Sequence, residues 1–111
     1  MFRCCPIVLV AFVFVLAPAR VDAQHEAGIK VYAAQKCSIC HSIAGEGNKK
    51  LPLDGVGTKL SADQIREWMV DPVAAAKKAK STAKPLMRAY PKLPKDELDA
   101  LVAYMKSLTK K

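Results

Sequence analysis

The 111-residue sequence predicts a small all-α domain with three main helices connected by two long loops. Three segments place apolar residues three and four positions apart, which is the spacing of one helix face. Between them lie stretches rich in glycine or proline, and no segment alternates for long enough to indicate a strand. Loops of this length without structure of their own usually wrap something, so we expect a bound group.

Residues 1–23 are predicted to be an export signal rather than part of the fold. A basic residue precedes an apolar run over residues 7–17, and the segment ends in small residues at Val21 and Ala23. The run is shorter than the roughly 20 residues of a membrane span, so an uncleaved anchor is the lesser alternative. We expect cleavage after Ala23, a single domain over residues 24–111, no stable membrane insertion and a periplasmic location.

Export changes the meaning of the cysteines and aromatic residues. Cys4 and Cys5 would leave with the signal, so Cys37 and Cys40 would be the two that stay. All three phenylalanines would leave as well. A domain this small has little apolar area to bury, and a large apolar cofactor could complete its core.

The first two helices are predicted over residues 26–37 and from Ser61 to about Val70. The second opens with Ser61 and has Gln64 three residues later, which is a capping-box pattern. Pro72 disfavours helical backbone at the preceding residue, so we expect this helix to end near Val70.

The helix predicted over residues 94–110 has the clearest pattern. Its apolar residues repeat at three and four, its acidic residues lie in the first turn and its lysines near the end, which suits the helix dipole. The connections over residues 44–57 and 81–94 are rich in glycine and in proline respectively, so both are predicted to be loops.

The motif CSICH, residues 37–41, carries the chemistry of the chain. Two thiols three positions apart can reach two neighbouring vinyl groups of one porphyrin, and the next residue then places its imidazole under the iron. The motif indicates one haem c per chain, attached through Cys37 and Cys40, with His41 as an iron ligand. The other nitrogen of His41 needs an acceptor, which we expect to be a carbonyl in the 51–57 loop.

Two other interpretations of the motif are less well supported. A redox dithiol of the thioredoxin type would be expected beside a βαβ pattern, which the sequence lacks. A structural zinc ion needs four ligands. Outside the motif and the signal, His25 is the only further cysteine or histidine.

The second iron ligand is predicted to be Met87. Met69 and Met105 lie on the apolar stripes of helices, where a methionine usually fills the core. Met87 lies in the proline-flanked segment KPLMRAYP, and an extended loop can present a thioether across the haem face. His25 is the competitor, but it lies among polar residues where we expect it to be solvated.

The sequence resembles the class I c-type cytochromes over residues 26–109. The resemblance rests on CSICH, LPLDGVGTKL, REWMVDP, KPLMRAYPKL and KDELDALVAYMKSL. It implies a small cytochrome c fold, with three main helices and long loops wrapped around one covalent haem that has His41 and Met87 as axial ligands. It also implies that Gly28 and Tyr32 pack on Leu101 and Tyr104.

The resemblance also bears on three further positions. In relatives a tryptophan like Trp68 often lies near a haem propionate, and a plain core role is the equal alternative. Relatives usually carry proline where this chain has Leu51, and often where it has Arg88. Any residue has a carbonyl, so Leu51 can still accept a hydrogen bond from His41.

The predicted ligands favour electron transfer over catalysis. With histidine and methionine both on the iron no coordination position is open, and the chain has no nucleophile with a base beside it, so we expect no enzyme activity. The first hypothesis is a periplasmic one-electron carrier between redox proteins. The alternatives are a small electron-accepting subunit of a periplasmic dehydrogenase or oxidase, and a ligand-binding or peroxidase-like haem protein in which Met87 does not bind iron.

The basic residues are concentrated in one part of the chain. Of the formal net charge of +8, much arises between residues 72 and 95, which contain no aspartate or glutamate. We call the cations of this interval the basic face: Lys77, Lys78, Lys80, Lys84, Arg88, Lys92 and Lys95. It is expected to steer acidic docking surfaces of redox partners, the alternative being a face that only aids solubility. Export argues against nucleic acid as the partner.

Overall fold

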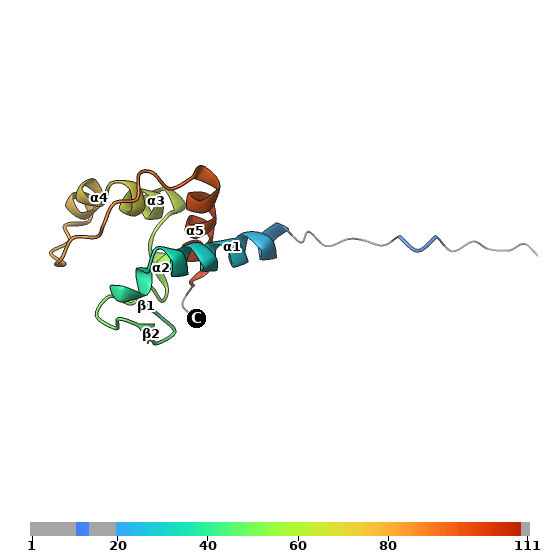
Figure 1. Cartoon of the computed structure of the whole chain (residues 1–111), viewed down its shortest axis with the longest axis horizontal. Helices are drawn as coiled ribbons and strands as arrows, with labels where there is room; N and C mark the ends of the chain where they lie inside the picture. The colour runs from blue at the N-terminus through green and yellow to red at the C-terminus, as the bar shows by residue number, and fades with distance from the viewer. Residues whose placement is uncertain (1–10, 14–19, 110–111) are drawn as a thin grey trace, which may run out of the picture.

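The computed structural model describes residues 11–13 and 20–109 (Figure 1). Most of the predicted signal, residues 1–23, therefore lies outside the described residues. Within the described part of the chain, no helix is both long and apolar enough to cross a membrane.

Helix α1 (Arg20–Ala34) crosses α5 (Lys95–Ser107), and this contact organises the fold (Figure 1). The helices touch at Gly28, where a Cβ atom would collide with the Ala100 carbonyl oxygen and lie 2.6 Å from Tyr104 Cβ. One turn later the Tyr32 ring meets Tyr104 edge-on, with 5.9 Å between centroids. The expected packing of Gly28 and Tyr32 on Tyr104 is confirmed.

Helix α1 ends three residues earlier than the sequence predicts. Lys36 has φ 55°, a left-handed conformation that a continuing helix cannot include. A single turn of 3₁₀ helix, η1 (Cys37–Ile39), follows. The cysteine motif is thus a separate tight turn rather than the end of α1.

Helices α3 (Ala62–Val70) and α4 (Pro72–Ala79) follow one another directly. The predicted capping box of α3 is confirmed, because Gln64 N donates to Ser61 Oγ and Ser61 N donates to Gln64 Oε1. Pro72 ends α3 as expected but also begins α4, where its missing N–H costs nothing. Helix α4 was not predicted from the sequence, and its first turn is capped by the Asp71 side chain, which accepts from Ala74 N.

The two predicted loops differ in the structure. Residues 81–94 contain neither helix nor strand, as expected. The 44–57 connection is more ordered than predicted. It includes strand β2 (Glu46–Gly47), which pairs antiparallel with β1 (Ser42–Ile43), and it leads into the short helix α2 (Val56–Lys59).

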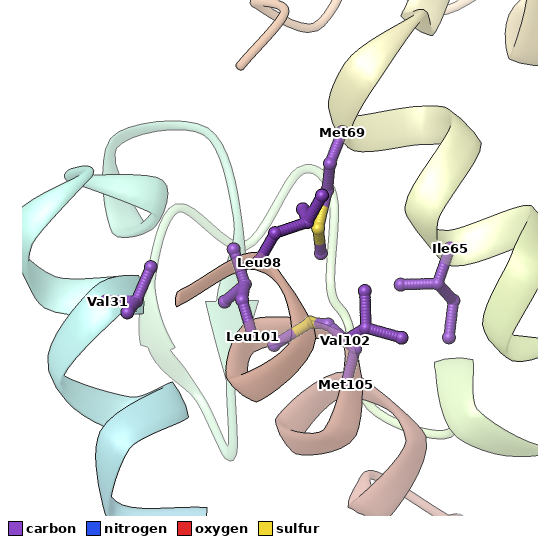
Figure 2. Close-up of a cluster of buried hydrophobic side chains, with 7 residues drawn as sticks. All are labelled: Val31, Ile65, Met69, Leu98, Leu101, Val102 and Met105. Carbon is purple, nitrogen blue, oxygen red and sulfur yellow. The ribbon is translucent and has the colours of Figure 1, made fainter. Parts of the chain in front are cut away.

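The core lies where α1, α3 and α5 meet (Figure 2). Its buried apolar side chains come from all three helices: Val31, Ile65, Met69, Leu98, Leu101, Val102 and Met105. Met69 and Met105 are only 5% and 4% exposed, which confirms their expected role as core residues. The all-α class is confirmed, although the chain forms more helices than the three main ones predicted.

We predict that Gly28→Ala destabilises the protein. Alanine favours a helix by about 1 kcal/mol over glycine, yet the added methyl must displace α5, and overpacking of this kind costs roughly 1–3 kcal/mol or more. Because the closest clash is with backbone, which cannot rotate away, the cost lies in the upper part of this range, and denaturant titration should show a net loss of about 1–2 kcal/mol in the free energy of unfolding. Ala33→Ser, at an exposed position of α1, serves as the control and should change it by less than about 0.5 kcal/mol. Equal stability of Gly28→Ala and wild type would contradict the packing argument.

Candidate haem-binding site

The cysteine motif is folded into one tight turn. Both Cys40 N and His41 N donate to the Cys37 carbonyl, at 3.2 and 2.9 Å. Cys37 is half-buried and Cys40 is exposed, and the two do not form a disulfide with each other. The turn therefore gathers the two thiols and the imidazole of His41 into one short segment.

The β1–β2 hairpin clamps this turn from outside. Asn48 N donates to the carbonyls of Ser38 and His41, both at 3.0 Å, and Asn48 Nδ2 donates to the Ile39 carbonyl at 3.0 Å. Gly47 adopts φ 103°, and a Cβ there would collide with the His41 carbonyl oxygen. This role of Asn48 was not predicted, and the adjacent glycine is the one signal for it in the sequence.

The imidazole of His41 is oriented by the next loop. Its Nδ1–H donates to the Leu51 carbonyl at 3.0 Å, since a carbonyl can only accept. The expectation of an acceptor in the 51–57 loop is confirmed, and the bond persists with leucine in place of proline. Because Nδ1 carries the proton, Nε2 keeps the lone pair that a metal ion requires.

The loop that holds Leu51 is itself tied back to the motif. Leu53 N donates to the Ser42 carbonyl at 2.8 Å, and Ala44 N donates to Asp54 Oδ1 at 2.9 Å. Leu51 precedes Pro52, which restricts its backbone to extended conformations. These contacts keep the acceptor of the His41 hydrogen bond in register.

Met87 lies in a segment anchored to α3. Tyr90 N donates to the Met69 carbonyl at 2.6 Å. Met87 is half-buried at the edge of the core, whereas Met69 and Met105 are enclosed in it. Met87 is thus the methionine whose thioether can leave the core without opening it.

A shared pocket places the same segment close to the start of the cysteine motif. Gln35, two positions before Cys37, and Tyr90 line one open pocket. Since Tyr90 lies three positions after Met87, the methionine segment lies near the start of the cysteine turn. The structure does not bring His25 to this region. Its ring is half-buried, not solvated as expected, and packs edge-on against Tyr104 with 5.2 Å between centroids.

A buried polar atom points to a missing partner at this site. The hydroxyl of Tyr32 is buried and has no hydrogen-bond partner. Burial, followed by the neighbouring Cys37, raises its pKa to about 12. A hydroxyl without a partner is costly, and such groups often mark a place where a further group binds.

The residues present fit a covalently attached haem. Two thiols, an imidazole with Nε2 available and a half-buried thioether form the donor set that haem c uses. The side chains of the protein also leave the core incomplete, because no large side chain among the described residues is less than 2% exposed. A large apolar group could complete it. Trp68 is half-buried on α3, and its contact with a propionate stays a prediction.

Comparison with protein families gives one match, to the family described as cytochrome c, over residues 25–109. The chain belongs to the cytochrome c family. The match confirms the resemblance to class I c-type cytochromes, the all-α fold class and the cofactor, covalently attached haem c with its iron. Members of the family are generally electron carriers with redox-protein partners. Neither curated proteins nor solved structures gave a significant match.

For the polypeptide before haem is attached, we predict that Tyr32→Phe is stabilising at neutral pH. Removing a buried hydroxyl that lacks a partner should raise the free energy of unfolding by about 1 kcal/mol. The variant should also change the alkaline limb of the stability curve. The pKa of Tyr32 is raised to about 12 in the folded state, so the unfolded chain loses the Tyr32 proton at lower pH than the folded chain does. The free energy of unfolding of wild type is therefore unaffected by this ionisation below pH 10 and falls as the pH rises toward 12.

The measurement is denaturant unfolding of the haem-free polypeptide at pH 7 and at several values between pH 10 and 12. In Tyr32→Phe the alkaline loss should be smaller than in wild type. Tyr104→Phe, on the facing helix, is the matched control at pH 7, because the Tyr104 hydroxyl is not among the buried groups that lack a partner. Burial also raises the pKa of Tyr104, so this variant is not a control for the alkaline limb. A Tyr32→Phe protein less stable than wild type at pH 7 would show that the hydroxyl has a partner in solution.

Proposed function

We propose that this cytochrome is a periplasmic one-electron carrier, with haem attached through Cys37 and Cys40 and the iron bound by His41 and Met87. The observation that carries the proposal is the His41 hydrogen bond to the Leu51 carbonyl, which turns Nε2 into the free ligand atom of a CxxCH turn. When bound, haem supplies the one-electron couple between ferrous and ferric iron.

The residues of the chain perform three tasks in this function. The fixed imidazole of His41 keeps its ligand atom in place, so little rearrangement accompanies a change of iron charge. A thioether ligand and a partly buried pocket favour the ferrous state and raise the reduction potential. Two protein ligands on the iron leave no position for oxygen or substrate, which suits a carrier rather than an enzyme.

Docking is proposed to use a smaller surface than the basic face as a whole. Lys78 forms an ion pair with Glu67 at 2.6 Å, and Lys95 pairs with Asp99 at 2.8 Å. The other cations of the basic face are exposed and lack an ion pair among the described residues: Lys77, Lys80, Lys84, Arg88 and Lys92. Lys77 and Lys80 lie at the end of α4, Lys84 lies between α4 and Met87, and Arg88 is next to Met87. At these positions they would attract an acidic partner to the haem side.

The ligand assignment is tested by replacing each methionine in turn. Met87→Ala should abolish the weak ferric absorption band near the red end of the spectrum that reports methionine ligation, and should allow carbon monoxide to bind the reduced protein. Met69→Ala and Met105→Ala should keep the band, although they should lose roughly 2–5 kcal/mol of stability as buried core residues. A wild-type protein without the band that binds carbon monoxide would instead support the ligand-binding alternative.

The docking surface is tested with small redox reagents of opposite charge. Oxidation by anionic hexacyanoferrate(III) should slow as salt rises, and Lys80→Glu should slow it severalfold at low salt because it reverses an unpaired charge. A cationic ruthenium hexaammine reagent should respond in the opposite sense. Lys59→Glu reverses an exposed charge on α2 and is the control. Equal effects of the two reversals would contradict a localised docking surface.

A further inference from the structure

Helix α2 is too short to be stable without outside contacts. It contains only four residues, whereas isolated helices below about 12–15 residues are marginal in water. Its last carbonyls have no partners within the helix. Whatever holds α2 also fixes the end of the segment that begins at Leu51, the acceptor of the His41 hydrogen bond.

Lys106 supplies much of this hold from α5. Its Nζ donates to the Gly57 carbonyl at 2.7 Å and to the Leu60 carbonyl at 3.2 Å. Hydrogen bonds from a charged donor are stronger than neutral ones, and one of these two is partly shielded from water. A single side chain therefore binds one carbonyl near the start of α2 and one just after its end.

The backbone closes the same contact. Gly57 N donates to the Leu108 carbonyl at 2.9 Å, and a Cβ at Gly57 would collide with the Lys106 carbonyl oxygen. The end of α5 and the start of α2 thus fit without space between them. Movement of α2 would have to break these bonds together.

The segment over residues 51–60 is consequently held on both sides of its middle. Near its start the Leu51 carbonyl meets His41, and Leu53 and Asp54 bond to residues just after the cysteine motif. At its far end the segment is held by Lys106, which is the anchor on α5. Leu51 lacks the fixed φ of a proline, and Pro52 restricts it only to the broad extended region, so the position of its carbonyl also depends on the anchors of the segment.

We propose that Lys106 is a positioning residue for His41. By holding α2 against α5 it keeps the Leu51 carbonyl on His41 Nδ1, and so sets the strength of that hydrogen bond and the reduction potential of the iron. The inference rests on the proposed function, in which His41 binds the iron. A strong bond from Nδ1 makes the imidazole a more basic ligand, which favours the ferric state.

The test compares Lys106→Met with two matched variants of the haem-loaded protein. Lys106→Met should raise the reduction potential because the His41 hydrogen bond weakens. Lys59→Met, at the exposed end of the same helix, removes an equal charge without removing these hydrogen bonds. It should lower the potential slightly or leave it unchanged, because loss of a cation disfavours the reduced iron. Lys106→Arg keeps a charged donor and should restore values close to wild type.

Hydrogen exchange of the His41 Nδ1 proton, followed by NMR, gives a second and independent reading. Lys106→Met removes the hydrogen bonds of a charged donor to α2, and one such bond contributes about as much free energy as a tenfold change in an equilibrium constant. If that free energy holds the Leu51 carbonyl on His41, its loss should speed the exchange of the His41 proton by about tenfold. Lys59→Met and Lys106→Arg should leave it near the wild-type rate.

The outcomes separate this inference from the function on which it rests. If wild type lacks a six-coordinate, low-spin spectrum, the proposed iron ligation is wrong and the role of Lys106 falls with it. If wild type has that spectrum but Lys106→Met changes neither potential nor exchange, only the positioning role is overturned. A lower melting temperature with both readings unchanged would show Lys106 to be merely structural.

Discussion

The contact between α1 and α5 at Gly28 is the constraint on which the rest of the structure depends. The backbones approach so closely there that no side chain fits between them. Helix α1 leads directly into the cysteine turn, and α5 contributes most of the buried core and also carries Lys106. One close crossing therefore fixes the start of the site and the surface on which its outer loop rests.

The site itself is made of loops that obtain their order from outside. The cysteine turn is clamped by Asn48, the His41 acceptor by the hairpin, and α2 by α5. Each piece is too short to hold its own shape. This arrangement explains how a chain with a thin core can hold the proposed ligand atoms in fixed positions. Hydrogen bonds between the loops restrict their movement, as burial of large side chains does in proteins with a larger core.

The sequence was most informative where the controlling interactions are local. The Ser61–Gln64 capping box, the end of α3 before Pro72 and the carbonyl acceptor for His41 were all predictable, because each depends on residues close in sequence or on a motif of fixed spacing. Helix α4 was missed because Pro72 was taken only as an end signal, although proline also suits the first turn of a helix.

The parts that could not be predicted depend on residues far apart in the chain. Lys106 and Gly57 are 49 positions apart, and nothing in a lysine near the end of a helix indicates that it will cap another one. The half-burial of His25 is similar, since it follows from the nearby ring of Tyr104 on the other helix. Lys78 and Lys95 looked equivalent to the other cations until their carboxylate partners on α3 and α5 were seen.

The backbone hydrogen bond from Tyr90 to Met69 affects how long the proposed ligand, Met87, could remain dissociated from the iron. Tyr90 follows Met87 by only three positions, and three extended residues span at most roughly 10 Å. A Met87 thioether that dissociated from the iron would stay at high effective concentration beside it, because the short segment between Met87 and the Tyr90 hydrogen bond limits how far it can move. Rebinding would then be intramolecular and fast, so brief detachment would leave the carrier's redox behaviour intact.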